Sequence, residues 1–308
     1  MEKPKIVVVG SSNTDMVIKL ERLPGPGETI IGGDFIMAAG GKGANQAVAA
    51  ARLGGEVTLV ARVGADIFGG QAIQNFQKEG INADFIVEDN EDPSGVALIF
   101  VDRKGENSIA VASGANENLS SEDVMKAKDV IASSEILIMQ LETPLETVKT
   151  AAKIAHENGV KVILNPAPAR ALDGPIYQYL SILTPNETEI ELLTGMTVQD
   201  EKSAEKAARV LLAKGLGTII VTLGSKGALL VTQDDCKRIP GFEVKAVDAT
   251  GAGDVFNGAL AVAIAEKKTL MDALLFANAA AALSVMKLGA QPSAPKRNEI
   301  ENLLRERL

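Results

Sequence analysis

The sequence predicts an α/β fold of three layers, in which helices cover both faces of a mainly parallel β-sheet. Short runs of β-branched residues alternate with longer helical patterns along most of the chain, and this alternation is typical of parallel sheets. The predicted strands are mostly continuous apolar runs, as expected when helices cover a sheet on both sides. The length of 308 residues fits two domains or one large α/β domain. We expect a single α/β/α domain over residues 1–308.

The central sheet and its helices follow one another in chain order. The predicted strands are at 6–10, 57–63, 135–139, 160–164, 182–183, 218–221 and 228–231. The predicted helices are at 43–53, 67–79, 144–158, 187–193, 202–214, 252–265, 270–286 and 296–307. Gly54 follows the first helix and Gly80 the second, because glycine readily adopts the left-handed backbone that ends a helix. Pro144 begins the third helix, where its missing N–H is not needed.

Four further strands predict a small β-sheet lid, inserted at about 15–38 and 95–112. They pair without an intervening helix, 16–20 with 29–37 and 96–101 with 108–112. The polar segment Asp102-Arg103-Lys104-Gly105-Glu106 predicts a hairpin turn between the second pair. The strand at 96–101 is apolar on both faces, although the lid has no helix to cover it. We expect a ligand to cover one face and a second subunit the other, giving a two-fold homodimer, unless the strand is buried within its own subunit.

Composition excludes several classes of function. Lys and Arg total 31 against 40 Asp and Glu, a net charge of −9, so sequence-independent binding of nucleic acid is not expected. A single cysteine, Cys236, and a single histidine, His156, exclude an internal disulfide and Cys-cluster or multi-histidine metal sites. No signal peptide or membrane-spanning segment is apparent. The composition is typical of a cytoplasmic enzyme that acts on small molecules.

The strongest motif is the segment 247–254, directly before the predicted helix at 252–265. Gly251 and Gly253 allow backbone N–H groups to approach an anion at a helix N-terminus. Asp254 would repel phosphate at a pure anion site, but it fits a base that takes a proton from an acceptor hydroxyl while the N–H groups hold a phosphoryl group. The alternative is that Asp254 only caps the helix.

Two polar motifs in the N-terminal part suit sugar hydroxyls. Gly40-Gly41-Lys42-Gly43-Ala44-Asn45-Gln46 opens a helix and offers N–H groups, an ammonium and an amide. It is neither a Walker A loop nor a G-x-G-x-x-G dinucleotide motif, and the alternative is a plain turn. Asn13 and Asp15 lie on the same side of an extended segment after the first strand, where the alternative is an Asx turn.

Two later motifs suit a nucleotide and its metal ion. Asn186 and Glu189 follow a strand and share one face of a helix start. Their oxygens are suited to Mg²⁺ or its waters, and the alternative is that both residues cap the helix. The segment 222–227 lies between two strands. Taken alone it predicts a hairpin turn, and taken together with the other motifs it predicts a loop that binds nucleotide phosphates.

Taken together, these motifs resemble the carbohydrate kinases of the ribokinase family, also called the PfkB family. Residues 40–54 resemble its first signature and 248–260 its second, and the similarity extends from Ile6 nearly to the C-terminus. Further matching motifs are Asn13-Thr14-Asp15, Gln140-Leu141-Glu142, Asn165-Pro166-Ala167-Pro168-Ala169 and Gly289-Ala290-Gln291-Pro292-Ser293. Lys42 favours ribose, because fructokinase-like members usually lack this lysine. The resemblance implies phosphorylation of D-ribose at its 5-hydroxyl by ATP, giving ribose 5-phosphate and ADP.

The resemblance also implies roles for individual residues. Asp254 is the expected base, and Gly251, Ala252 and Gly253 form the expected anion hole. The expected ribose ligands are Asn13, Asp15, Gly41, Lys42, Gly43, Ala44, Asn45 and Glu142, together with Asp254. The expected ATP site comprises Asn186, Thr222, Leu223, Gly224, Ser225, Lys226, Gly227, Gly253 and Asn278. An activating K⁺ is expected at Asp248, Thr250, Ser284, Lys287, Gly289 and Ser293, and Mg²⁺ is expected near Asn186 and Glu189, through water. Asn278 replaces a histidine often found there.

Three alternatives remain at this point. One is a kinase of the same fold that acts on deoxyribose, fructose or another hexose, or a nucleoside, because pocket geometry decides between single hydroxyls. Another is a sugar-binding relative that has lost activity, which the intact Asp254 and glycine-rich loops disfavour. The third, an NAD-linked oxidoreductase, is disfavoured by the missing dinucleotide motif.

Overall fold

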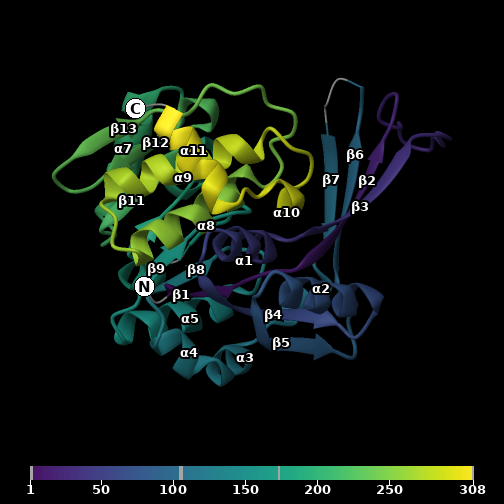
Figure 1. The fold of residues 1–308 in the computed structure, drawn as a ribbon, viewed down its shortest axis with the longest axis horizontal. Coiled ribbons are helices and arrows are strands. Elements are labelled where there is room, and N and C mark those ends of the chain that lie inside the picture. The colour runs from purple at the N-terminus through teal and green to yellow at the C-terminus, as the bar shows by residue number, and fades with distance from the viewer. Residues whose placement is uncertain (1–2, 104–106, 173, 307–308) are drawn as a thin grey trace.

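The main body is built on a nine-stranded sheet (Figure 1). The structure is a computed structural model that describes residues 3–103, 107–172 and 174–306. The strand order is β13-β12-β11-β10-β9-β8-β1-β4-β5. The strands are β1 (Lys5–Val9), β4 (Glu56–Gly64), β5 (Asn82–Asp89), β8 (Ile136–Met139), β9 (Lys161–Leu164), β10 (Ile182–Leu183), β11 (Thr218–Thr222), β12 (Ala228–Val231) and β13 (Cys236–Ile239). All neighbours from β5 to β11 are parallel, and only β12 and β13 are antiparallel.

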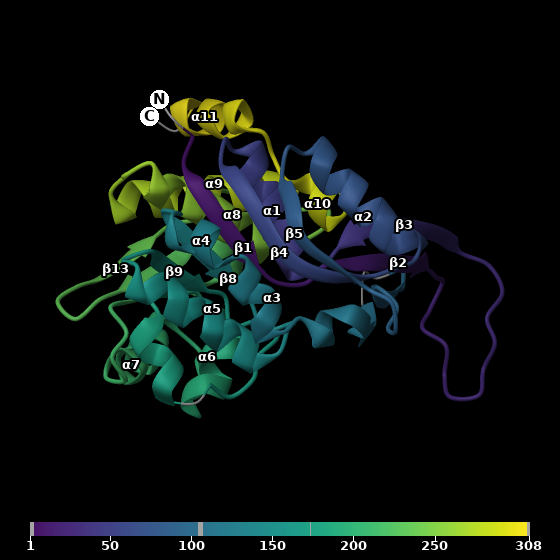
Figure 2. The same ribbon diagram turned by 90° about the horizontal axis from the view of Figure 1, so that it is seen from below.

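Helices cover both faces of this sheet, which confirms the predicted three-layer α/β fold (Figure 2). The helices are α1 (Lys42–Arg52), α2 (Ile67–Lys78), α3 (Ser121–Lys126), α4 (Lys128–Ala132), α5 (Leu145–Glu157), α6 (Glu187–Thr194), α7 (Glu201–Leu212), α8 (Ala252–Ala265), α9 (Leu270–Ser284), α10 (Ala290–Ser293) and α11 (Arg297–Glu306). Strand β1 shows the pattern: Ile6 and Val8 belong to one buried cluster, with α1, α8 and α9, while Val7 and Val9 belong to the other, with α5 and α7. Among the described residues, no helix combines the length and the apolar character needed to cross a membrane.

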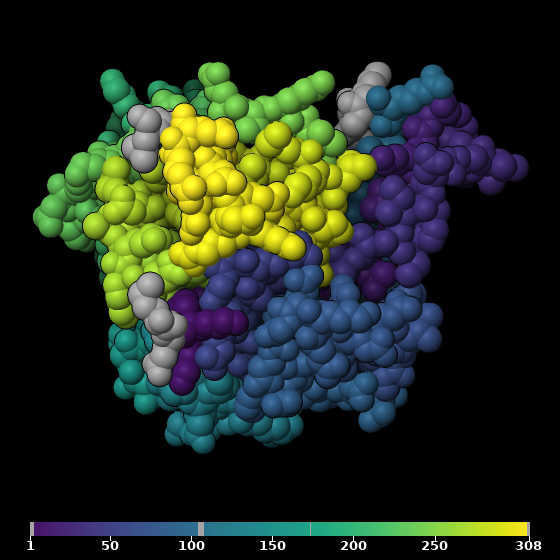
Figure 3. Space-filling view, in the orientation of Figure 1, coloured from purple at the N-terminus to yellow at the C-terminus, as the bar shows by residue number. Residues whose placement is uncertain are grey.

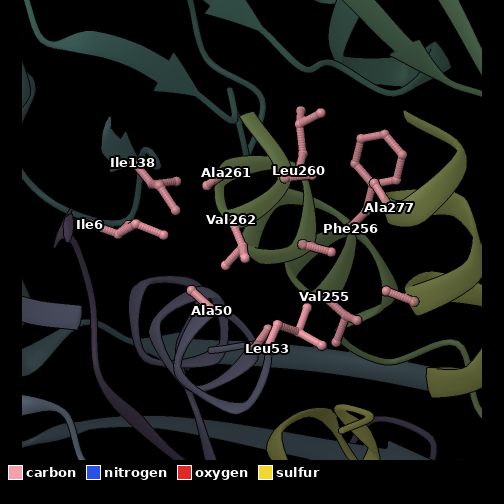
Figure 4. Close-up of a cluster of buried hydrophobic side chains, with 14 of the residues drawn as sticks. Ile6, Ala50, Leu53, Ile138, Val255, Phe256, Leu260, Ala261, Val262 and Ala277 are labelled. Carbon is pink, nitrogen blue, oxygen red and sulfur yellow. The ribbon is translucent and has the colours of Figure 1, made fainter. Parts of the chain in front are cut away.

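Helix α8 lies in the core, and its N-terminus carries Asp254. All its residues from Asp254 to Ala265 are buried, and it packs against α1 and α9 (Figure 4). At the crossing with α1 the two backbones are so close that a Cβ on Gly258 would lie 2.7 Å from the Cβ of Ala49 and 2.8 Å from the backbone oxygen of Gln46. This close approach holds the start of α8 against the start of α1.

A Gly258→Ala substitution is therefore expected to destabilise the protein by about 1–3 kcal/mol, because the added methyl group overpacks the crossing. Denaturant unfolding measures this change. Gly70→Ala is the matched control, since a Cβ at Gly70 in α2 meets nothing within 4 Å and alanine favours a helix by up to about 1 kcal/mol over glycine. Equal stability of the two variants would contradict the packing argument.

The small second sheet was predicted correctly, but with shifted bounds. It contains β2 (Asn13–Lys19), β3 (Asp34–Gly40), β6 (Gly95–Val101) and β7 (Asn107–Ala112) in the order β3-β2-β6-β7, and we call it the accessory sheet. The strand predicted at 29–37 begins only at Asp34, because Gly32 and Gly33 adopt positive φ angles. Residues 13–15, predicted as an extended segment, belong to β2 and pair with β3 and β6, so the Asx-turn alternative is wrong. Of the predicted hairpin turn 102–106, residues 104–106 lie outside the described residues.

Several elements were not predicted. Strand β5 carries Asp84, Glu88 and Asp89, which break the apolar pattern at an edge of the sheet. Strand β13 begins at Cys236, which is partly buried, and burial is the chief cause that raises the pKa of its thiol to about 11. The helices α3, α4 and α10 are too short to show the repeated apolar spacing that predicts a helix. The helix predicted at 270–286 ends at Ser284.

Candidate active site

A cavity of about 400 Å³ lies between the accessory sheet and the body of the protein. Its floor holds residues that were predicted to bind a sugar: Asn13, Asp15, Gly41, Lys42, Asn45, Glu142 and Asp254. Apolar side chains of the accessory sheet, Ala97, Ile99, Ile109 and Val111, form the opposite wall. We call this the sugar-side cavity. One wall is polar and the other apolar, which is the arrangement a polyol with one hydrophobic face requires.

A second, larger cavity of about 850 Å³ lies on the other side of the α8 N-terminus. It is lined by the predicted nucleotide residues Asn186, Thr222, Gly224, Ser225, Gly227, Gly253 and Asn278, together with apolar residues such as Phe242, Phe256 and Val285. We call this the nucleotide-side cavity. Asn278 donates its Nδ2 hydrogens to the backbone oxygens of Ile239 and Pro240, so its amide braces the loop after β13.

The two cavities meet at the loop before α8. Thr250 and Gly251 line the sugar-side cavity, whereas Ala252 and Gly253 line the nucleotide-side cavity. Gly251 is the N-cap of α8 and adopts a left-handed conformation with φ 75°. The Ala252 N–H donates to the backbone oxygen of Ala249 at 3.2 Å. The N–H groups of this helix start lie between the two cavities, where a group passing from one ligand to the other must cross.

Comparison with known proteins agrees with this geometry. A model of the pfkB family carbohydrate kinases matches residues 3–297. The chain belongs to the pfkB family of carbohydrate kinases. The ribokinase of Haemophilus influenzae is 48% identical to this kinase over 294 residues, 96% of each chain. The deoxyribokinase of Salmonella typhi is 41% identical over 300 residues, 97% of this chain and 98% of that one. A ribokinase structure from Arabidopsis thaliana, complexed with ribose and ATP, has a TM-score of 0.91 at 35% identity, with 99% of both chains covered. The predicted family and fold class are confirmed.

In this pfkB family kinase, Asp254 is buried and held by two amides. Asn45 donates from Nδ2 to Oδ2 of Asp254 at 2.9 Å, and Gln46 donates from Nε2 to Oδ1 at 3.0 Å. Burial raises the pKa of Asp254, while Lys42 and the two amides lower it. A carboxylate held in this way, at the floor of the sugar-side cavity, is suited to accept a proton from a bound hydroxyl.

Asp15 and Glu142 complete the acidic side of the cavity. Glu142 accepts hydrogen bonds through Oε2 from the Ser11 hydroxyl and from the backbone N–H of Lys42, so its position is fixed by the backbone. Asp15 lies on β2, and burial raises its pKa to about 7, with further contributions from the carboxylates of Glu142 and Asp254. With Asp254 and Glu117, four carboxylates thus share one cavity with a single lysine, Lys42. They are suited to accept hydrogen bonds from the hydroxyls of a sugar.

The raised pKa of Asp15 gives a prediction for the stability of the ligand-free protein. The folded state holds a proton on Asp15 up to about pH 7, whereas the unfolded state releases it near pH 4. Asp15 therefore destabilises the fold increasingly as the pH rises from about 4 to 7. We expect Asp15→Asn to be more stable than the parent at pH 8, on the order of 2 kcal/mol after screening by solvent, and to lose most of that advantage near pH 4. Urea unfolding at both pH values checks this, and a pH-independent difference would contradict it.

The structure places several predicted residues outside the cavities. Gly43 and Ala44 are buried in α1, and a Cβ on Gly43 would lie 2.5 Å from the backbone nitrogen of Ser11, so this glycine serves close packing. Leu223 is buried in the core, and Lys226 is exposed at the surface. These four residues were predicted as ligands because they lie within the matching segments, but their neighbours in those segments line the cavities.

The predicted metal residues lie at two places. Asn186 and Glu189 form a capping box at the start of α6, in which each side chain accepts from the other's backbone N–H, so the capping alternative is observed. Asp248 accepts from the Thr250 backbone N–H at 2.9 Å and from Gly289 at 2.8 Å. It thus joins the loop before α8 to the loop before α10. Within the described part of the chain, no three His, Cys, Asp or Glu side chains gather as a metal site.

Sequence reasoning missed the residues that hold the candidate ligand-binding side chains in place. Asn116, 2% exposed, donates to Oδ1 of Asn13 at 2.8 Å and accepts from the Ser12 backbone N–H. The group that Asn13 can offer to a ligand is therefore its Nδ2 donor. Gln46 holds Asp254 in a comparable way. The partners are far apart in the sequence, so no local spacing indicates either contact.

Proposed function

We propose that this kinase transfers the γ-phosphoryl group of ATP to the 5-hydroxyl of D-ribose, giving D-ribose 5-phosphate and ADP. The observation that carries the proposal is the meeting of the two cavities at the α8 N-terminus, with Asp254 on the sugar side. The relatives described as ribokinases, 48% identical in one case and solved with ribose and ATP in another, support the choice of substrates.

The mechanism follows from the placement of the residues. With ribose in the sugar-side cavity, Asp254 accepts the proton of the 5-hydroxyl as its oxygen bonds to the γ-phosphorus. The bond from that phosphorus to the β,γ-bridging oxygen breaks, and ADP leaves with the bonding electron pair. The N–H groups of Gly251, Ala252 and Gly253 stabilise the charge on the transferred group. Since this transition state is loose, positioning matters more than the strength of the base.

Mg²⁺ would reach the phosphates beside Asn186 and Glu189. The capping box uses Oδ1 of Asn186 and Oε2 of Glu189, so the residues fit contact through water and not direct coordination, in keeping with the hydration that Mg²⁺ retains in proteins. Bound there with the nucleotide, the ion would neutralise phosphate charge.

The test is ribose-dependent formation of ADP by the purified protein. We expect ADP release to require ribose and to leave 5-phosphate as the sugar product, identified by NMR. Assays with 2-deoxyribose, fructose and a nucleoside at equal concentrations serve as the comparison. A higher kcat/KM for 2-deoxyribose would favour the second candidate, a deoxyribose kinase, which the 41% identity to a deoxyribokinase supports. ATP binding without turnover of any sugar would overturn both.

We further propose that the protein is a homodimer through the outer face of the accessory sheet. Cross-strand register places Phe35, Met37 and Leu98 on the face opposite to Asp15, and they are 59%, 46% and 46% exposed. The alternative of a strand buried within its own subunit does not fit this exposure. Figure 3 shows the β2–β3 part of this sheet at the margin of the molecule. Light scattering at micromolar concentration is expected to give twice the chain mass, and a monomer would overturn the proposal.

We also propose that K⁺ binds near Asp248 and braces the loop before α8. The residues fit such an ion: Ser284 and Ser293 are buried with hydroxyls beside backbone carbonyls. Lys287 pairs with Glu299, so it would contribute only its backbone oxygen. Turnover is expected to rise when K⁺ replaces a bulky organic cation at constant ionic strength, and Asp248→Ala is expected to abolish that response. Turnover that is indifferent to K⁺ would overturn the site.

A further inference from the structure

A chain of buried amides contacts Asp254 and does not belong to the sugar-side cavity lining. Gln140 donates from Nε2 to Oε1 of Gln46 at 2.7 Å, and Gln46 donates from Nε2 to Oδ1 of Asp254 at 3.0 Å. Gln46 is 0% exposed and Gln140 1% exposed. Neither side chain lines either cavity as described above. The proposed transfer of a phosphoryl group does not assign them a role.

The orientation of the Gln46 amide is fixed from both ends. Its Oε1 accepts from Gln140, and its Nε2 carries a second hydrogen that is donated to Oδ1 of Asn165 at 3.1 Å. The Asn165 amide is in turn fixed, because its Nδ2 donates to the backbone oxygen of Thr184. A backbone carbonyl can only accept, so the direction of the whole chain is set by Thr184. Gln46 must then present a donor to Asp254.

This direction matters because the surroundings of Asp254 are acidic. Lys42 on α1 attracts its negative charge, but Glu142 after β8 and Glu189 on α6 repel it, and so does Asp15 on β2 above about pH 7, where it is ionised. Burial disfavours the ionised form further. Each carboxylate oxygen of Asp254 nevertheless receives one amide N–H, from Asn45 and from Gln46. A Gln46 amide turned the other way would place an oxygen against Oδ1 and favour the protonated acid, which cannot accept a proton.

We propose that Gln46, oriented by Asn165 and Gln140, is a positioning residue that keeps Asp254 ionised and aimed at the acceptor hydroxyl. This inference rests on the proposed function, because it assigns Gln46 to the base of that reaction. It also explains Gly10: a Cβ there would lie 2.1 Å from Oε1 of Gln140, so only glycine leaves room for the end of the chain.

The first test is the pH dependence of kcat for ribose phosphorylation. Gln46→Glu keeps the size of the side chain, but the new carboxyl shares a proton with Asp254 and so raises the pKa of Asp254. When the pH is lowered, this variant should therefore lose activity at a higher pH than the parent does. We expect the acid limb to move up by about one pH unit or more. Gln46→Met, which lacks the donor, and Gln140→Met, which releases the Gln46 amide, are expected to move it by smaller amounts in the same direction.

A matched control separates this role from simple packing. Val48 lies two residues further along α1 and is 1% exposed, and Val48→Ala leaves a cavity without touching Asp254. We expect it to lower the melting temperature and the amount of folded protein, with the acid limb unmoved. If Gln46→Glu and Gln46→Met also leave the acid limb where it is in the parent, the proposal is overturned, whatever their effect on stability.

A second measurement needs no turnover. In protein labelled with ¹³C at the aspartate carboxyl carbons, Asp254 is assigned from the resonance that Asp254→Asn removes, and its titration is followed by NMR. We expect a higher midpoint in Gln46→Glu than in the parent. A parent protein that hydrolyses ATP without ribose, or that is inactive, would count against the proposed function alone. An unchanged titration midpoint of Asp254 in Gln46→Glu would count against the role proposed for Gln46, whether or not the protein is active.

Discussion

Asp254→Asn is expected to lower kcat by about 10³-fold, within the 10²–10⁴ range of a general base. Asparagine has the same shape but cannot take the proton of the 5-hydroxyl. The buried carboxylate also loses its charge, so the folded state is not expected to lose stability, because burial disfavours the ionised form. KM for ATP should change little, since the nucleotide-side cavity is lined by Gly253 and not by Asp254.

Single-turnover kinetics and calorimetric titration with ATP measure the two parts of this expectation. The comparison variant is Asp89→Asn, which also removes a buried carboxylate but lies outside both cavities, and it should retain far more activity. Turnover of Asp254→Asn within tenfold of the parent would mean that another group takes the proton, and the mechanism given above would then be wrong.

Gly251→Ala is expected to lower kcat by about 10²-fold or more, the size of effect seen when one donor of an anion hole is lost. Gly251 has a φ angle of 75°, which is strained for any residue with a Cβ. A Cβ there would also lie 2.8 Å from the Cβ of Ala290 and 2.9 Å from its Cα. The loop must therefore shift, and its N–H groups move from where the transferred phosphoryl group passes.

Gly215→Ala is the matched control for this substitution. Gly215 also has a positive φ angle, 102°, but a Cβ there meets nothing within 4 Å, and it lies outside both cavities. We expect both variants to lose stability from backbone strain, on the order of 1 kcal/mol, and only Gly251→Ala to lose turnover. Circular dichroism melts and steady-state assays of the two proteins give the comparison.

The three-layer fold was predictable because its evidence is local. Val, Ile and Leu runs mark β1, β8 and β9, and glycines mark the ends of α1 and α2. Strand β5 was missed because it lies at the edge of the sheet, where Asp84 and Glu88 replace apolar residues. The bounds of β3 were wrong because the sequence shows β-branched Ile30 and Ile31 but not the positive φ angles of Gly32 and Gly33 that delay the strand.

The candidate ligand-binding side chains were predictable to the extent that they lie in short motifs. Asn13, Asp15 and Asp254 each follow a strand or a glycine pair, and the structure brings them into one cavity. Gln46 stands in a motif as well, yet its contact with Asp254 spans 208 residues of sequence. Such contacts depend on how α1 and α8 cross, and no spacing within a single segment encodes a crossing.

The crossing of α1 and α8 separates residues whose substitution is constrained by core packing from residues that can be substituted without changing that packing. The proposed base, its amides and the proposed anion hole all lie on two helices whose backbones approach closely at Gly258, so a substitution among them is expected to disturb the chemistry and the core together. The wall of the sugar-side cavity formed by Ala97, Ile99 and Ile109 belongs to another sheet and makes no hydrogen bond to Asp254. Changes of sugar preference during evolution, or in the laboratory, are therefore best sought on that wall, where a new acceptor can be admitted while the catalytic frame stays intact.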